Sequence, residues 1–349
     1  MTLTSRAYPV ADFRAAQELF VQNGWGDGLP VIPPTPDLVA AFVDAAAMPA
    51  EEVIGTIPEQ AREITVEKVA VNAVAAGCRE EYMSVLLAAM RALTRPQFNL
   101  HSTTVSGATA PLLLISGPVV GQLALNTSFS LFGPGYHANA TLGRAIRLVL
   151  QNVCGGVPGV LDKSTFGHPG KFSYCIGESL ADNPWSPLHA DHGVAAEASA
   201  VTVFAGEGPI NARNDWASQP GPILATIADA MLPSHYTGGC FVVVLGPLHA
   251  ALLARAGMTK PDVRRELFGR AQRTVAEMKR AGRMPGEPDV GDDEQIRRAV
   301  RRPEDILITV AGGNLYGYSA VVPYWVGGHE SMPVTEALSA AEAGRCQLA

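Results

Sequence analysis

Charged side chains are scarce in this sequence, at 17% of its 349 residues, whereas roughly 25% is usual for soluble proteins. A low charged fraction suggests that another subunit covers part of the surface, so we expect a homo-oligomer. Basic residues are outnumbered by acidic ones, and the net charge is −7. Because binding to nucleic acid needs a clustered basic face, we expect no nucleic-acid partner.

Long apolar runs are also missing. No stretch forms an uninterrupted apolar span of ~20 residues, the length that crosses a bilayer, and residues 1–20 lack the apolar core of a signal peptide. We therefore expect a cytoplasmic protein without a membrane partner.

Cysteine is limited to five scattered residues, and none of them belongs to a C-x-x-C pair. This pattern indicates neither a disulfide framework nor a structural zinc site. We predict no cofactor, and any cysteine chemistry would use a single thiol.

Glycine and proline are abundant instead, with 35 and 26 residues, and many of them lie between residues 151 and 193. We expect this segment to consist mostly of turns. The same segment holds two cysteines and three histidines. Because every polar backbone group of a buried loop needs a partner, such a long irregular segment is more often functional than filler.

Two stretches share one order of features and predict an α/β fold. Residues 110–126 and 240–257 each read as an apolar strand, a Gly-Pro break and a helix, and residues 306–323 begin with another apolar strand. We predict a central mixed or largely parallel sheet with flanking helices, built from two similar strand-Gly-Pro-helix halves. Sheets of this class bind ligands at the carboxyl ends of their strands.

We divide the chain into three parts on this basis. Residues 1–64 provide N-terminal helices and a Pro-rich loop that wraps the body. Residues 65–205 form the first α/β half with the Gly/Pro-rich loop, and residues 206–349 form the second half. Within the first part, the rigid loop at residues 24–37 is either a stiff linker or a pocket wall that includes Trp25 and Asp27.

The segment 133–153 predicts a helix that carries Asn139, Arg144 and Arg147 among apolar neighbours. The two arginines are three residues apart and therefore share a face. An arginine in such surroundings either pairs with a buried carboxylate or binds an anionic ligand. We assign these three residues to substrate binding, together with Trp25, Asp27 and the strand-end residue Glu207.

The Gly/Pro-rich loop supports thiol chemistry as one alternative. Alternation of Phe172, Tyr174 and Ile176 predicts a strand that places Cys175 on the opposite face, where a pocket would meet it. The nearby Lys171 and His168 would lower the pKa of the Cys175 thiol and make it a nucleophile.

General acid/base chemistry is the second alternative, carried by His168 with Asp162 or by Glu178 with Lys171. The third is a metal site formed by His189 and His192. We predict no catalytic metal, because these histidines lie in a Pro-bounded loop without a further regularly spaced ligand. The catalytic candidates are therefore Cys175, His168, Glu178 and Lys171.

Several motifs resemble one known family. They include GWGDGLPVIPPT, TVEKVAVNAVAAGC, ATLGRAIRLVLQNV, KSTFGHPGKFSYCIGE, NPWSPLH and SAVTVFAGEGP. The chain resembles the long module of the UGSC-containing (seleno)protein family, although it lacks the U-G-S-C motif that carries the reactive selenol or thiol. It also departs from the family pattern at GESLADNPW and at His192, which puts the identity of the substrate in doubt.

The resemblance implies a small-metabolite enzyme or an enzyme subunit. We expect a cytoplasmic enzyme that acts on a small, polar, anionic metabolite by acid/base or thiol chemistry, similar to a lyase or a reductase. The alternative is a non-catalytic subunit that completes the active site of a small thiol- or selenol-bearing partner protein.

Overall fold

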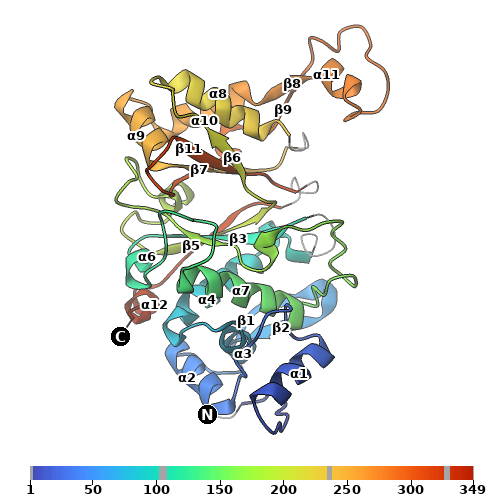
Figure 1. Cartoon of the computed structure of the whole chain (residues 1–349), viewed down its shortest axis with the longest axis vertical. Helices are drawn as coiled ribbons and strands as arrows, with labels where there is room; N and C mark the ends of the chain where they lie inside the picture. The colour runs from blue at the N-terminus through green and yellow to red at the C-terminus, as the bar shows by residue number, and fades with distance from the viewer. Residues whose placement is uncertain (1–2, 102–107, 234–237, 326–330, 349) are drawn as a thin grey trace.

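The protein is a four-layered α/β structure in which two sheets stack face to face between two layers of helices (Figure 1). The computed structural model describes residues 3–101, 108–233, 238–325 and 331–348. The first sheet has the strand order β12-β5-β3-β4 and the second β10-β7-β11-β6. Their strands are β3 (Ala110–Ser116), β4 (Cys175–Gly177), β5 (Ala200–Gly206), β6 (Ile210–Arg213), β7 (Phe241–Leu245), β10 (Ile306–Val310), β11 (Tyr318–Val322) and β12 (Val334–Ala337).

The α/β class predicted from the sequence is confirmed, but the expected single central sheet is replaced by two. Strand β3 shows that both faces of the first sheet are buried. Leu113 and Ile115 point into a core shared with the helices below, whereas Leu112 and Leu114 point into a core shared with the second sheet. A strand buried on both faces reads as one continuous apolar run, so its sequence does not reveal what covers each face.

The two sheets are built by the same pairing scheme. In each, a central strand pairs in parallel with one neighbour and antiparallel with the other: β3 with β4 and β5, and β7 with β10 and β11. The fourth strand of each sheet pairs away from the strand that precedes it in the sequence. Strand β6 follows β5 but pairs with β11, and β12 follows β11 but pairs with β5. The two sheets therefore share one pairing scheme, and the chain crosses between them before β6 and again before β12.

This crossing shows how the expected three-part division relates to the fold. Residue 206 falls at the end of β5, where the chain crosses to the second sheet, and β12 later returns it to the first. The N-terminal part packs in the same apolar core as the first half. The helix expected after the first Gly-Pro break is only the single turn α6 (Val119–Gln122), whereas α9 (Pro247–Arg255) follows the second.

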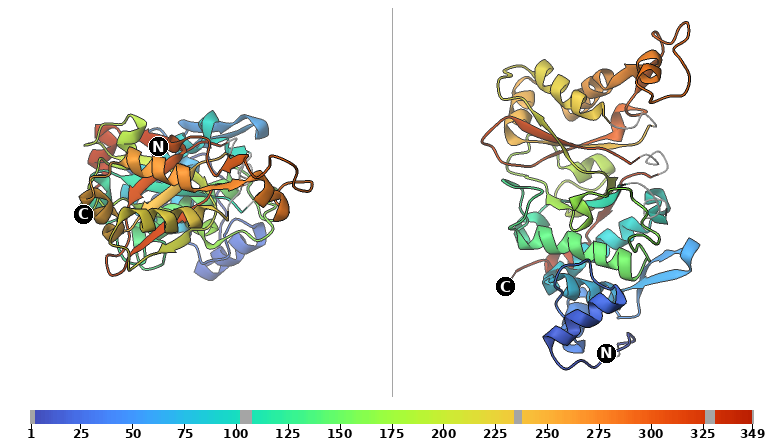
Figure 2. Two further views of the ribbon diagram at one scale, coloured as in Figure 1. Left: turned by 90° about the horizontal axis from the view of Figure 1, so that it is seen from above. Right: turned by 45° about the vertical axis from the view of Figure 1, so that its right-hand side comes forward.

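Helices cover the outer face of each sheet (Figures 1 and 2). On the side of the first sheet lie α1 (Phe13–Asn23), α2 (Pro36–Ala46), α3 (Val66–Ala76), α4 (Met83–Leu93), α7 (His137–Asn152) and α12 (Ala340–Arg345). On the side of the second lie α8 (Pro220–Met231), α9 and α10 (Lys260–Arg270). No helix in the described part of the chain is long and apolar enough to span a membrane.

Two small hairpins complete the fold. Strands β1 (Val53–Ile57) and β2 (Arg62–Thr65) pair beside α3, and β8 (Gln272–Thr274) pairs with β9 (Ile296–Arg298). The second hairpin leads to α11 (Val275–Arg280), which stands away from the body (Figure 2). Helix α3 ends at Gly77, whose φ of 84° lies in the left-handed region that glycine adopts most easily.

Candidate functional site

Arg144 and Asp27 form an ion pair that fixes the Pro-rich loop to α7. The Asp27 carboxylate accepts hydrogen bonds from Arg144 Nε at 2.7 Å and Nη2 at 2.9 Å. Nη2 also donates to the carbonyl of Pro30 at 2.8 Å. Burial would raise the pKa of Asp27, but the hydrogen bonds and charge of Arg144 hold it below its ordinary value. Of the two roles considered for Arg144, pairing with a carboxylate is therefore the one found.

Arg147 lies one turn further along α7 and faces a second polar cluster. Lys171 Nζ donates to Asp162 Oδ2 at 2.6 Å and to Ser164 Oγ at 2.8 Å. The Arg147 guanidinium approaches the same Asp162 oxygen at 3.6 Å, across a cavity of about 30 Å³. Burial lowers the pKa of Lys171, although Asp162 opposes this shift. Two predicted site residues, Arg147 and Lys171, are thus brought together.

Neither predicted acid/base pair is formed. Lys171 donates to Asp162, and among the described residues no hydrogen bond or ion pair joins Asp162 to His168 or Lys171 to Glu178. His168 accepts a hydrogen bond from the backbone N–H of Gly170, and burial lowers the pKa of its imidazole. The partners that the structure shows for Lys171 and His168 are thus other residues than the two predicted ones.

Glu178 follows β4 and is only 3% exposed. Its carboxylate accepts hydrogen bonds from the backbone N–H of Leu188, at 2.9 Å, and from the side chain of Asn183, at 3.0 Å. Burial raises the pKa of Glu178 despite these hydrogen bonds. The carboxylate therefore holds the loop around Leu188 in place between the two sheets.

Cys175 lies in β4 with the side-chain alternation that the sequence predicts, but the face it occupies is not a pocket. Cys175 joins the apolar core under the helices, whereas Tyr174 and Ile176 join the core between the sheets. Burial raises the pKa of the Cys175 thiol well above its ordinary range. The activated thiolate suggested by Lys171 and His168 is therefore not supported, since burial and the nearby Cys78 thiol both raise the pKa of Cys175.

The side-chain amide of Asn139 forms hydrogen bonds with backbone groups. Its Oδ1 accepts from the N–H of Asn126 at 2.8 Å, and its Nδ2 donates to the carbonyls of Asn126 and Cys175, each at 3.2 Å. Glu207 lies on the other side of β4, where its carbonyl accepts a hydrogen bond from the hydroxyl of Tyr174. The geometry of Asn139 is that of a brace between α7 and β4 rather than a substrate contact.

The segment containing His189 and His192 has structural partners. His189 is fully buried and lies 2.6 Å, through Nδ1, from the hydroxyl of Ser116. Asp191 pairs with Lys260 and Arg264 of α10 at 2.9 and 2.6 Å. Among the described residues, no group of three His, Cys, Asp or Glu side chains could hold a metal ion.

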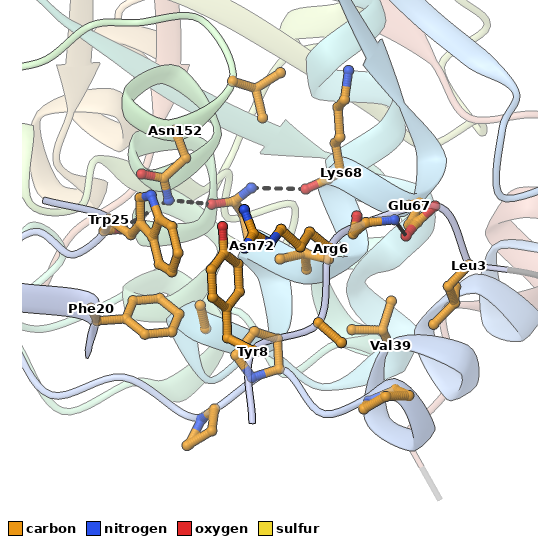
Figure 3. A pocket seen from close by; sticks show the side chains of 18 of the residues that line it. Leu3, Arg6, Tyr8, Phe20, Trp25, Val39, Glu67, Lys68, Asn72 and Asn152 are labelled. Carbon is orange, nitrogen blue, oxygen red and sulfur yellow. Dashed lines mark hydrogen bonds between the residues drawn. The ribbon is translucent and has the colours of Figure 1, made fainter. Parts of the chain in front are cut away.

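A large open pocket lies elsewhere, at the N-terminal end of the molecule (Figure 3). It has a volume of about 1300 Å³ and is lined by residues of α1, α2, α3, the β1–β2 hairpin, the end of α7 and the N-terminal segment. Trp25 packs against Tyr8 and Phe20, with ring centroids 5.2 and 5.8 Å apart. The apolar lining includes Leu3, Tyr8, Val10, Ala16, Leu19, Phe20, Trp25, Val39, Val71 and Ala75.

Polar groups lie on one side of this N-terminal pocket (Figure 3). Asn152 donates to the carbonyl of Trp25 and to the side chain of Asn72. Lys68 Nζ donates to the carbonyl of Glu63 at 2.7 Å. The Arg6 guanidinium lies over the Tyr8 ring at 4.8 Å. The pocket thus combines an apolar body with cationic groups.

One carboxylate closes the pocket along its N-terminal edge. Glu67 accepts hydrogen bonds from the backbone N–H and hydroxyl of Thr4 and from the N–H of Ser5. Burial would raise the pKa of Glu67, but these donors hold it below its ordinary value. Glu67 thereby fixes residues 3–8 as one wall of the pocket.

Of the predicted site residues, only Trp25 lines this pocket. The sequence analysis missed Tyr8, Lys68, Asn72 and Asn152, which lie in the N-terminal segment and on two helices. The signal available for them was weak, because a polar stripe on a helix next to apolar residues also describes an ordinary solvated face.

No protein-family model matches the chain, and no curated protein is significantly similar to it in sequence. The resemblance to the UGSC-containing family, carried by the motifs above, therefore stays a prediction.

Proposed function

We propose that this chain binds an organic anion with a large apolar body in the N-terminal pocket, as the substrate-binding part of a small-molecule enzyme. The observation that carries the proposal is a cavity of about 1300 Å³ with an aromatic and aliphatic lining and cationic side chains on its wall. A large apolar pocket with a few polar groups is the usual form of a small-molecule site.

The volume sets the size of the ligand. Pockets that take drug-sized molecules usually measure ~300–1,000 Å³. A volume of about 1300 Å³ is much larger than a metabolite of a few carbon atoms would fill. The anionic metabolite expected from the sequence is therefore better described as amphipathic, with a ring system or a branched chain that packs against Tyr8, Phe20 and Trp25.

The charged side chains that line the pocket indicate the charge of the polar end of the ligand. Three cations line the pocket, Arg6, Arg62 and Lys68, against the two carboxylates Glu63 and Glu67. The Glu67 carboxylate already accepts hydrogen bonds from the N–H groups of Thr4 and Ser5, which stabilise its negative charge. The surplus of donors over acceptors favours a carboxylate, sulfonate or phosphate on the ligand.

The thiols bear on the chemistry that would follow binding. Burial raises the pKa of Cys78, Cys154 and Cys240 to about 12 and that of Cys346 to about 11. With Cys175 also buried, none of the five thiols ionises readily. If the reaction uses a thiol or selenol, a partner protein supplies it, which is the second role proposed for this chain: a subunit that holds the substrate.

The experiment uses 8-anilinonaphthalene-1-sulfonate, an aromatic anion whose fluorescence rises in apolar surroundings. We expect one equivalent to bind the wild-type protein with defined affinity. Lys68→Met should weaken binding by roughly three- to tenfold, the effect of losing ~1 kcal/mol of charge interaction. Lys163→Met, which removes an exposed lysine outside the pocket, is the matched control.

Saturable binding that responds to Lys68→Met but not to Lys163→Met supports the proposal. Non-saturable binding, or equal affinity in all three proteins, would show that the pocket does not select an organic anion. Activity assays on the isolated chain, with and without proteins that co-purify from its host, then separate the enzyme from the substrate-binding subunit.

A further inference from the structure

Arg147 has a buried guanidinium without a hydrogen-bond acceptor. Its side chain is 15% exposed, and its nearest carboxylate oxygen, on Asp162, lies at 3.6 Å, beyond hydrogen-bond distance. Within the described part of the chain Arg147 donates no hydrogen bond, whereas its neighbour Arg144 donates to Asp27 and Pro30. A guanidinium has five N–H donors, so the largely buried Arg147 side chain has donors available to a small acceptor.

Asp162 compensates for this charge only in part, because two other groups also bind its carboxylate. Its Oδ2 accepts from Lys171 at 2.6 Å, and its Oδ1 accepts from the hydroxyl of Ser164 at 2.6 Å. Arg147 and Lys171 thus share a single carboxylate. The three side chains together carry one surplus positive charge.

Thr109 supplies an independent observation at the same place. Thr109 is 5% exposed, and among the residues that the structure describes its hydroxyl oxygen has no hydrogen-bond partner. Thr109, Arg147, Asp162 and Lys171 all line the cavity of about 30 Å³, whose other walls are mainly glycine and aliphatic residues. Buried hydroxyls are nearly always paired, so the orphan at Thr109 indicates a missing partner.

We infer that this cavity is a binding site for one small monovalent anion, held by the guanidinium of Arg147, the ammonium of Lys171 and the hydroxyl of Thr109. The surplus positive charge favours an anion over water, because all three groups have hydrogens to donate. A volume of about 30 Å³ suits a halide ion or a single carboxylate group better than a larger oxyanion such as methanesulfonate. This site is separate from the N-terminal pocket and does not depend on what binds there.

Thermal unfolding in different sodium salts at equal ionic strength tests the inference. We expect chloride or formate to raise the Tm of the wild-type protein by roughly 1–3 °C relative to methanesulfonate. Arg147→Met should abolish this selective rise. Thr109→Val, which removes the hydroxyl at almost constant shape, should reduce it without lowering the Tm measured in methanesulfonate.

Arg264→Met is the matched control. Arg264 is similarly buried, at 13% exposure, but it is paired with Asp191 at 2.6 Å. Its loss should lower the Tm in every salt and leave the selective rise intact. Because each variant is compared with itself in the reference salt, a general loss of stability does not imitate the expected result.

The pattern of response also identifies the source of the anion. A rise with chloride alone assigns a free halide, and a rise with formate assigns the carboxylate of a metabolite. The absence of a selective rise in the wild-type protein would overturn the inference, as would an undiminished rise in Arg147→Met. Neither result bears on the binding of 8-anilinonaphthalene-1-sulfonate, so this test fails or succeeds separately from the proposed function.

Discussion

Arg144 joins two parts of the chain that lie 117 residues apart, because its guanidinium holds the carboxylate of Asp27 through two hydrogen bonds of 2.7 and 2.9 Å. The loop that begins at Trp25 is thereby fixed to α7. The side chains of Gln151 and Asn152 on the same helix donate to the carbonyls of Gly26 and Trp25. This set of contacts places Trp25 in the wall of the N-terminal pocket.

Breaking this ion pair should therefore destabilise the protein. We expect Arg144→Met to lower the free energy of unfolding by ~3 kcal/mol, since it leaves a largely buried carboxylate without its partner. The double variant Arg144→Met/Asp27→Leu should recover part of the loss. Urea unfolding of the three proteins measures both effects, and a double variant no more stable than the single one would contradict the pairing.

The same ion pair predicts a pH dependence. Asp27 has a folded-state pKa below its ordinary value of 3.8, so the fold favours the ionised carboxylate. Its contribution to stability is fully present above the unfolded pKa and is lost as the pH falls through the lower folded pKa. The stability difference between wild type and Asp27→Asn should therefore shrink in acid. A difference that stays constant across this range would exclude the linkage.

Asn139 should matter for stability rather than for ligand binding. Replacing it with leucine removes the partner of the Asn126 N–H and of the Cys175 carbonyl, whereas the Asn126 carbonyl still accepts from the N–H of Gly177. We expect a loss of ~2–3 kcal/mol in the free energy of unfolding, with unchanged affinity for 8-anilinonaphthalene-1-sulfonate. Asn23→Leu, at the exposed end of α1, is the control. A selective loss of dye binding in Asn139→Leu would restore the substrate-binding role predicted from the sequence.

Cys175 should resist alkylation in the folded protein. Burial raises the pKa of its thiol, and its 5% exposure limits access to the sulfur. Peptide mass spectrometry after brief treatment with iodoacetamide should find Cys175 unmodified in the native state and modified in urea. Rapid native-state labelling, faster than that of a free thiol, would contradict the inert thiol and support the nucleophilic role considered for Cys175.

Much of the strand pattern could be predicted from the sequence, because β3, β7 and β10 are continuous apolar runs bounded by Gly and Pro. Their arrangement could not. Whether Leu112 meets a helix or a second sheet depends on long-range packing, and so do the crossings of the chain between the sheets before β6 and β12. Local pattern specifies a buried strand but not its neighbours.

The candidate site was harder to predict than the fold. Arg147 was predicted as a basic residue among apolar neighbours and Lys171 as an acid/base residue, but the carboxylate of Asp162 that both approach could not be predicted from either motif. Cys175 was placed on the correct side of its strand, whereas what covers that side could not be known. The N-terminal pocket is assembled from segments that are distant in the sequence, so no single motif indicates it.

The central claim is that the N-terminal pocket receives an aromatic anion beside Trp25. Energy transfer from tryptophan to bound 8-anilinonaphthalene-1-sulfonate tests it directly, because the transfer falls steeply with distance. Trp216, which is 90% exposed and does not line the pocket, provides the control. We predict that Trp25→Phe removes more of the sensitised emission per bound dye than Trp216→Phe. An equal or smaller decrease in Trp25→Phe would place the dye elsewhere and contradict the assignment of this pocket.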